Sequence, residues 1–443
     1  MANSEKESVS LLLNAAWVMP LTPGDEIFAP GAVAVRGSHL VAVGPREEVA
    51  GCFTAERVLD YPKGLILPGL INAHTHAAMA LFRGLADDLP LEEWLNSHIF
   101  PAEKHLDYQF VYWGTRLAVA EMLLSGTTTF CDMYLFTDAV AQAVVDTGIR
   151  AVVGEVLYDF PSPNYGKPEN GLKFTEELCR SYEDHPRVRV AVEPHAVYTC
   201  SPDLLTKSKA LADRFRTRWI IHLSETAKEV ADCLEHYGDT PVGHLHRLGL
   251  LAGNTVADHA VALTDRDMDL LADSGVGVAH CPESNMKLAS GMAPVADLLA
   301  RGVPVGLGTD GCASNNNLDM LTEMDTAAKL AKVRGLDPTA LPARQALALA
   351  TRSGARVLGL GGEVGMLAPG LKADLVVIDL DQPHLTPLYD PYSHLVYAAT
   401  GADVQTVMVE GRLLVENREL VAYDLAETLA RARELGRKVK KTF

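Results

Sequence analysis

The sequence predicts an α/β fold in which a (β/α)8 barrel carries a small β-sandwich domain formed by the N- and C-terminal segments. Short apolar runs alternate with helix-length segments through the middle of the chain, and hairpin patterns occur at both ends. Polar side chains follow the central apolar runs, as they do at the functional end of a barrel. The predicted bounds are residues 1–64 and 366–443 for the two parts of the β domain and 65–365 for the barrel.

The composition is that of an ordinary folded enzyme. Apolar residues make up 48% of the 443 residues and charged residues 22%. The net charge of -18 would repel phosphate backbones, and the basic cluster at 437–441 is short, so we expect no nucleic-acid partner. The N-terminus lacks the pattern of a secretion signal and no segment has the apolar length of a membrane span, which predicts a cytoplasmic protein with no membrane partner.

The cysteines indicate reduced thiols. There are seven, they are scattered, and none forms a C-x-x-C pair, so neither a disulfide framework nor a cysteine-based zinc site is expected. The same absence excludes the nucleobase deaminases built on H-x-E and P-C-x-x-C.

Hairpin patterns at the two ends of the chain predict the β domain. Residues 32–35 and 40–43 are apolar and flank the turn-forming residues 36–38. Residues 406–409 and 413–415 repeat this pattern around Glu410, Gly411 and Arg412, after an apolar run at 374–378. We therefore expect the ends to share one small domain.

The strands of the barrel are predicted from apolar runs, each separated from the next by a helix-length segment. The eight runs are residues 65–67, 127–130, 151–153, 188–192, 219–221, 255–257, 275–278 and 305–307.

Metal-competent side chains follow these runs. Since the carboxyl ends of barrel strands converge on one face, residues far apart in sequence can surround a single ion there. The groups are His74 and His76, Glu193 and His195, His222 and Glu225, Asp258 and His259, His280, and Asp310.

His74, His76, His222 and Asp310 are the predicted metal ligands. In an extended backbone, alternate side chains point to the same side, so His74 and His76 can reach one ion. A catalytic zinc takes neutral imidazoles and a carboxylate and keeps a position for water. Taken singly, His222 could be a structural histidine and Asp310 a helix cap, but their joint order over successive strands favours a metal site.

The remaining polar groups have weaker individual signals. Glu225 lies three residues after His222 and is placed as a proton shuttle, although the same position suits a first-turn glutamate. His259 could be a further ligand or could hold the attacking water, and His280 could only line the pocket. No lysine follows the fourth strand to bridge two metals, so one ion is expected.

Several motifs resemble the amidohydrolase superfamily over most of the chain. They are L-P-G-L-I-N-A-H-T-H (67–76), R-G-L-A-D-D-L-P-L-E-E-W-L (83–95), H-L-S-E (222–225), H-C-P-E-S-N (280–285) and G-T-D-G-C-A-S-N-N-N-L-D (308–319). Within it, the sequence looks most similar to the methylthioadenosine/S-adenosylhomocysteine deaminases, with triazine chlorohydrolases and guanine deaminases as neighbours.

This resemblance implies one zinc ion on the four predicted ligands and a purine nucleoside substrate. It implies that Asp310 accepts a proton from the attacking water, that His259 orients this water, and that Glu225 protonates the purine ring before C6 is attacked. Iron, manganese and cobalt also suit histidine and carboxylate ligands.

The resemblance also implies substrate contacts. Glu103 would bind the ribose diol and His195 the nucleoside, while Trp94 and Leu95 could pack on a 5′-thioether or only form helix core. Relatives that handle S-adenosylhomocysteine place an arginine after the third strand, where this chain has Glu155. We therefore expect 5′-methylthioadenosine to be preferred over S-adenosylhomocysteine, because Glu155 would repel the homocysteine carboxylate. Adenosine is a second expected poorer substrate.

Two other functions are also compatible with the sequence. The substrate could be another N-heterocycle such as guanine or a triazine, which needs no diol contact. The barrel could also be a scaffold without catalysis, although such a protein should have lost its ligands. Family members of this type are often homo-oligomers, so we also consider a dimer or tetramer.

Overall fold

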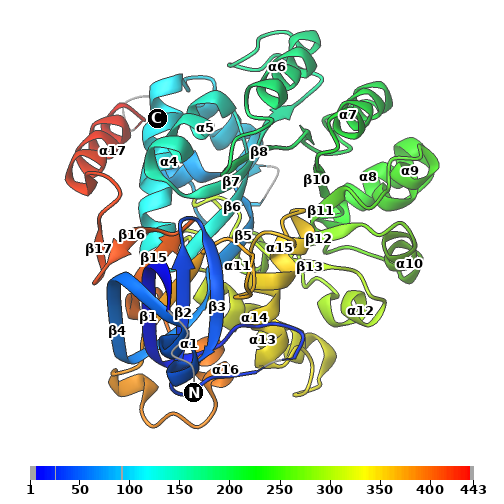
Figure 1. The fold of residues 1–443 in the computed structure, drawn as a ribbon. Coiled ribbons are helices and arrows are strands. Elements are labelled where there is room, and N and C mark those ends of the chain that lie inside the picture. Colours follow the sequence, from blue (N-terminus) through cyan, green and yellow to red (C-terminus); the bar gives the residue numbers. More distant parts are fainter. Residues whose placement is uncertain (1–5, 25, 91–92, 440–443) are drawn as a thin grey trace.

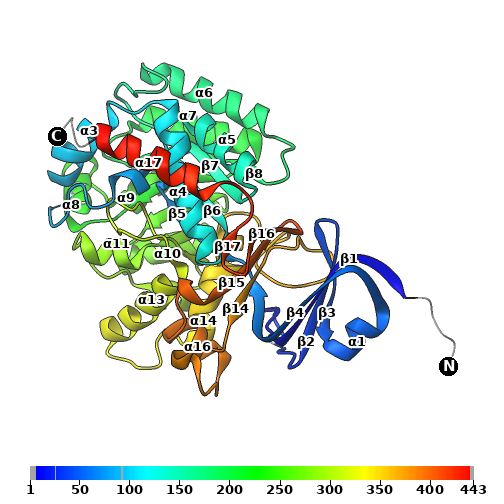
Figure 2. The ribbon, with the colours of Figure 1, turned by 90° about the vertical axis from the view of Figure 1, so that its left-hand side faces the viewer.

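The computed structural model describes residues 6–24, 26–90 and 93–439. Its centre is a barrel of parallel strands with helices around the outside, and a separate sheet lies beside it (Figures 1 and 2). Positions 91 and 92 of the 83–95 motif and positions 440 and 441 of the basic cluster lie outside the described residues.

Parallel pairing joins the barrel strands in chain order. Two hydrogen-bonded sheets run β5-β6-β7-β8, with β9 on β7, and β10-β11-β12-β13. Parallel bridges from Val192 to Trp219 and from Ala196 to His222 connect them on one side. On the other side the Asp310 backbone N–H donates to the His74 carbonyl at 3.0 Å, which closes the ring. The barrel strands are β5 (Leu70–Thr75), β6 (Thr127–Tyr134), β7 (Arg150–Leu157), β8 (Val188–Val190), β9 (Glu193–Pro194), β10 (Trp219–Leu223), β11 (Thr255–His259), β12 (Gly277–His280) and β13 (Val305–Leu307).

One predicted barrel strand is misplaced. Residues 65–67 belong to β4, which pairs with β1 and β14 outside the barrel, and the first barrel strand is β5. The two strands are separated only by Gly69, where a Cβ would lie 2.1 Å from the Thr128 hydroxyl oxygen. Residues 65–71, which span the end of β4 and the start of β5, contain no polar side chain, so periodicity could not separate the two strands.

The two ends of the chain form one continuous hydrogen-bonded sheet, and both predicted hairpins are confirmed as β2 with β3 and β15 with β16. The antiparallel pairing of β4 with β14 joins the N-terminal strands to the C-terminal ones. The order is β17 (Glu419–Leu420), β16 (Arg412–Glu416), β15 (Val404–Val409), β14 (Leu375–Asp379), β4 (Phe53–Pro68), β1 (Glu7–Val18), β2 (Gly31–Arg36) and β3 (His39–Pro45).

Helices fill the connections between the strands, and the C-terminal helix α17 packs on α4 (Figure 2). Within the described residues, each helix is too short or too polar to cross a bilayer. The helices are α1 (Arg46–Cys52), η1 (Ala77–Phe82), η2 (Trp94–Ile99), α3 (Phe100–Glu103), α4 (Tyr108–Leu124), α5 (Thr137–Thr147), α6 (Pro168–Ser181), α7 (Pro202–Phe215), α8 (Ala227–Tyr237), α9 (Pro241–Arg247), α10 (Asp265–Asp273), α11 (Pro282–Lys287), α12 (Val295–Ala300), α13 (Met320–Gly335), α14 (Ala343–Ala348), η3 (Leu349–Ser353), α15 (Gly354–Val357), η4 (Pro383–Leu385), α16 (Pro391–Tyr397), η5 (Gly401–Asp403) and α17 (Leu425–Val439).

A buried ion pair ties the barrel to the small sheet. The Arg150 guanidinium, at the start of β7, donates to both Asp374 carboxylate oxygens, at 2.8 and 3.2 Å, and to the Pro186 carbonyl at 2.8 Å. The side chains of Arg150 and Asp374 are 2% and 1% exposed. Arg150 therefore points away from the face where the polar strand ends converge.

We expect Arg150→Met to lower the free energy of unfolding by about 3–5 kcal/mol, because it leaves the Asp374 carboxylate buried and unpaired. Denaturant titration of the variant and the parent protein measures this loss. The exposed pair of Arg36 with Glu7 offers a control, since Arg36→Met should cost less than about 1 kcal/mol. A loss as small as the control's would show that the buried pair does not stabilise the contact between barrel and sheet.

Candidate metal centre and active site

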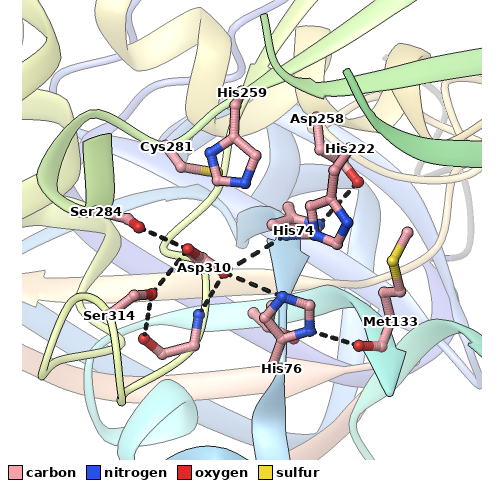
Figure 3. A network of polar contacts seen from close by, with 12 residues as sticks. His74, His76, Met133, His222, Asp258, His259, Cys281, Ser284, Asp310 and Ser314 are labelled. Atoms are coloured by element: carbon pink, nitrogen blue, oxygen red, sulfur yellow. Dashed lines mark hydrogen bonds and ion pairs between the residues drawn. The ribbon is translucent and has the colours of Figure 1, made fainter. Parts of the chain in front are cut away.

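Four histidines and one aspartate meet at the carboxyl ends of the barrel strands (Figure 3). His74 ends β5 with Thr75, and His76 directly follows this strand. His222 and His259 lie at the ends of β10 and β11, and Asp310 follows β13. Potential ligand atoms of His74, His76 and Asp310 lie within 4.8 Å of one another, as do those of His74, His222 and His259. The strand order thus brings together every residue predicted to bind the metal.

Each of the three predicted histidine ligands is anchored through Nδ1. The Nδ1–H groups of His76 and His222 donate to the backbone carbonyls of Met133 and His195, the second at 2.9 Å. Nδ1 of His74 lies 3.0 Å from the buried Asp258 carboxylate. Because the carbonyls can only accept, these contacts fix the tautomer and leave Nε2 as the free ring nitrogen, which is how metal-binding histidines are usually held.

Asp310 completes the cluster. Its Oδ1 lies 3.2 Å from His76 Nε2 and 3.5 Å from His74 Nε2. Burial alone would raise the pKa of Asp310, but the hydrogen bonds from the two histidines outweigh it and hold this pKa well below its usual value. Asp310 is therefore available as a carboxylate.

The close approach of the chain after β13 to His74 depends on Gly308, where a Cβ would lie 2.7 Å from the His74 backbone nitrogen.

The donor set fits a divalent metal ion. Burial and the neighbouring histidines hold the pKa of His222 well below its usual value, so this imidazole is neutral. Burial would also lower the pKa of His74, but Asp258 and Asp310 raise it well above its usual value. A cation between the histidines and Asp310 would replace the proton that these carboxylates favour on His74. Three imidazoles and one carboxylate form a ligand set of the catalytic type.

Glu225 lies beside the cluster in the turn after β10. Ser224 has a left-handed backbone with φ of 54°, and the turn is held by Glu229, which accepts hydrogen bonds from the backbone nitrogens of Ser224 and Glu225 at 2.9 and 2.7 Å. Glu225 is 6% exposed and lines the central pocket, and Ser290 donates to its Oε1 at 3.3 Å. The structure thus places this carboxyl beside the predicted metal ligands.

The central pocket opens next to the metal cluster and has a mainly aromatic and aliphatic wall. All residues predicted to contact the metal or the substrate line it except His74, which is fully buried. The lining residues are His76, Met79, Trp94, Leu95, Ile99, Phe100, Glu103, Met133, Tyr134, Val156, Tyr158, His195, Tyr198, His222, Glu225, His259, Leu288 and Asp310.

Two predicted substrate contacts have shifted pKa values. Burial raises the pKa of Glu103 to about 7. Burial, with the nearby His76, His74 and His259, lowers the pKa of His195 to about 3, so its ring is neutral. Its Nδ1 lies 2.9 Å from the Thr199 hydroxyl. Both side chains can therefore exchange hydrogen bonds with a polar ligand inside an apolar wall.

Glu155 differs from its predicted position. Its carboxylate is fully buried and accepts hydrogen bonds from the backbone and hydroxyl of Thr137 and from the side chain of Asn164. It is not among the residues that line the pocket, so the prediction that it repels a substrate carboxylate is wrong. His280 is also buried away from the pocket wall.

Sequence reasoning missed the residues that orient the cluster. Asp258 is among the metal-competent groups that follow the predicted strands, but the sequence assigns it no role, and in the structure it pairs with His74. Ser284 and Ser314 donate to Asp310, and Asn285 contacts His259. Ser284 and Asn285 lie within the H-C-P-E-S-N motif, which was the available signal. The Met133 and His195 carbonyls have no signal in a sequence, because every residue carries one.

Comparisons with known proteins identify the family of this chain. Residues 65–414 match the model of the amidohydrolase family. The chain is 58% identical over 430 residues to a protein named 5-methylthioadenosine/S-adenosylhomocysteine deaminase from Syntrophobacter fumaroxidans, covering 97% of this chain and 98% of the relative. This bears out the resemblance stated from the motifs.

Solved structures with bound zinc have the same fold. An adenosine deaminase from Xanthomonas campestris superposes with a TM-score of 0.97 at 41% identity, covering 98% of this chain and 100% of that one. Atrazine chlorohydrolase from Arthrobacter aurescens TC1 superposes with a TM-score of 0.87 at 25% identity, covering 96% and 100%. Both are described with zinc, which together with the histidine cluster supports a metal site here. The family match and the near-complete alignments show that this chain is a hydrolase of the amidohydrolase family.

Proposed function

We propose that this chain hydrolytically deaminates the adenine ring of 5′-methylthioadenosine, giving 5′-methylthioinosine and ammonia. The observation that carries the proposal is that one pocket unites the metal cluster, the Glu225 carboxyl and, on its wall, the Glu103 carboxyl. The name of the relative that is 58% identical supports the same substrate. Deamination at C6 needs the metal and the Glu225 carboxyl. A riboside substrate would in addition form hydrogen bonds with the Glu103 carboxyl.

The proposed roles follow from these positions. A divalent ion on His74, His76, His222 and Asp310 would acidify a water molecule enough to supply a nucleophile near neutral pH. Glu225 donates a proton to the purine ring nitrogen, which makes C6 more electrophilic. His259 orients the attacking water, and Asp310 accepts one of its protons and returns it to the departing amino group. The second proton of the water goes to Glu225 as the C6 carbonyl forms, which restores the acid. The adenine amino group leaves as ammonia.

The pocket wall supports a preference for an uncharged 5′ substituent. Trp94, Leu95 and Phe100 present apolar surface, and the described lining residues include no lysine or arginine. A homocysteine carboxylate would therefore enter without the cation that normally pairs with it. S-Adenosylhomocysteine is proposed as a poorer substrate for this reason and not because of Glu155. Adenosine is also proposed as a poorer substrate, because it lacks the 5′-thioether group that the apolar wall would contact.

Zinc is the proposed ion, with iron and manganese as alternatives that metal analysis of the purified protein would identify. A cytoplasmic location and a dimeric or tetrameric state stay predictions from the sequence.

A substrate panel tests the proposal. Metal-replete protein is mixed in parallel with 5′-methylthioadenosine, S-adenosylhomocysteine, adenosine and guanine, while ultraviolet absorbance and ammonia release are followed. We expect the highest kcat/KM with 5′-methylthioadenosine. Turnover of guanine, with no reaction of any adenine nucleoside, would refute the proposed substrate and leave the family membership intact.

Glu103→Gln should reduce kcat/KM for ribosides by about 10²-fold, because the carboxylate can accept two hydrogen bonds from a diol and an amide only one. A free-base substrate should be unaffected. Since the pKa of Glu103 is about 7, the accepting form is lost as pH falls. The riboside KM should therefore rise below about pH 7 in the parent protein but not in Glu103→Gln. Equal pH profiles for the two proteins would exclude this role.

A further inference from the structure

Two adjacent buried side chains of α11 contact the residues proposed to handle the attacking water. Ser284 is fully buried and Asn285 is 1% exposed, and neither has a role in the chemistry proposed above. Ser284 contacts Asp310, which follows β13, and Asn285 contacts His259, at the end of β11. A single short helix thus connects Asp310 with His259.

Ser284 fixes the outer oxygen of the Asp310 carboxylate. Its hydroxyl donates to Asp310 Oδ2 at 2.5 Å, and the Ser314 hydroxyl donates to the same oxygen at 2.7 Å (Figure 3). The Gly311 backbone N–H donates to Oδ1 at 2.8 Å, which leaves this oxygen with room toward His74 and His76. The carboxylate therefore has one orientation, with Oδ1 directed at the cluster.

Asn285 fixes the ring of His259. Its side-chain Oδ1 lies 2.9 Å from His259 Nδ1, and its Nδ2 has no hydrogen-bond partner among the described residues. Since an amide oxygen can only accept, His259 carries its proton on Nδ1. The free electron pair is then on Nε2, where it can accept a hydrogen bond from water in the pocket.

Backbone strain gives a second, independent reason why these contacts matter. His259 and Asp310 both have left-handed backbones, with φ of 69° and 61°. Residues other than glycine keep such conformations only where their surroundings hold them, and they concentrate at functional sites. Ser284 and Asn285 contact these two strained residues through their side chains.

We propose that Ser284 and Asn285 are a pair of positioning residues that set the orientation of Asp310 and the tautomer of His259. Their effect on turnover rests on the proposed function, whereas the orientation itself does not. The two groups that exchange hydrogen bonds and protons with the attacking water are thereby held at a fixed mutual geometry by neighbouring residues of one helix.

The test uses Ser284→Ala and Asn285→Leu, with Ser284→Thr and Asn285→Asp as variants that keep the hydroxyl and the accepting oxygen. We expect kcat to fall about 10–100-fold in the first two, as for other groups that orient metal ligands, with KM changed less than about threefold. The conservative variants should recover most of this loss. In Ser284→Ala the dissociation constant for zinc, measured by chelator competition, should rise about tenfold.

Nitrogen-15 NMR of histidine-labelled, metal-free protein reads the tautomer without any turnover. His259 should be protonated on Nδ1 in the parent and in Asn285→Asp, and should show a mixture in Asn285→Leu. A parent protein with His259 protonated on Nε2 would overturn the proposal even if no variant folded. This readout also stays valid if the substrate panel shows that the proposed reaction is wrong.

Ser208→Ala is the matched control, because Ser208 is a fully buried serine whose hydroxyl accepts a hydrogen bond from Trp219 in the barrel wall. It should lower the thermal midpoint without changing kcat or zinc affinity. If Ser284→Ala and Asn285→Leu behave like this control, the two residues are only structural and the proposal fails.

Discussion

Asp310→Asn will reduce kcat by about 10³–10⁴-fold and lower the zinc content of the purified protein. The amide keeps the shape of the side chain but loses the negative charge that the neighbouring histidines hold on Asp310. It also cannot accept the proton of the attacking water, a role that typically contributes 10²–10⁴-fold. Steady-state kinetics and metal analysis on the same preparation measure both effects.

Chelation of the parent protein should give a comparable loss, and added zinc should restore it in the parent but not in Asp310→Asn. Asp297→Asn is a control on a half-buried aspartate that pairs with Arg334 away from the pocket. Full activity in Asp310→Asn, or in the chelated protein, would contradict the proposed metal-dependent chemistry.

Glu225→Gln will reduce kcat by about 10²–10⁴-fold while the metal content stays at the parent level. Glu225 lines the pocket beside the cluster but is not among the residues whose atoms converge on a metal position. The glutamine keeps the hydrogen bond to the ring nitrogen but has no acidic proton to donate. Glu235→Gln, on the exposed side of the following helix α8, is the control.

Asp310→Asn and Glu225→Gln together distinguish the carboxyl group that binds the metal from the one that donates a proton to the purine. Loss of metal in Glu225→Gln would make this residue a ligand, and retention of activity would leave the purine without its proposed acid. Either result would require a different assignment of the proton donor.

The features that could be predicted from sequence are those with a repeating signal. Apolar runs marked most of the barrel strands, and polar residues at their ends marked the cluster, because parallel strands converge at their carboxyl ends. The exception is residues 65–67, where the end of β4 and the start of β5 form one nearly unbroken apolar stretch. Nothing in that composition shows that the strands belong to different sheets.

Predictions for single side chains without such a signal were weaker. Position 155 was interpreted from its place after a strand, but the pleat and the nearby Thr137 and Asn164 turn its carboxylate into the protein. The contacts of Ser284 and Asn285 depend on where a short helix lies relative to two strands. Such placement follows from tertiary packing, which local sequence patterns do not encode.

His76 and His222 are held by backbone carbonyls, so the orientation of these metal ligands does not depend on the side chains that select the substrate. The carbonyls that hold these rings belong to Met133 and His195, whose side chains line the pocket. A substitution at either position can reshape the wall while the carbonyl, and hence the orientation of the metal ligand, is preserved. Substitutions in the wall can therefore change the substrate range of this architecture without moving the metal ligands. A zinc-bound adenosine deaminase and a zinc-bound atrazine chlorohydrolase share its fold.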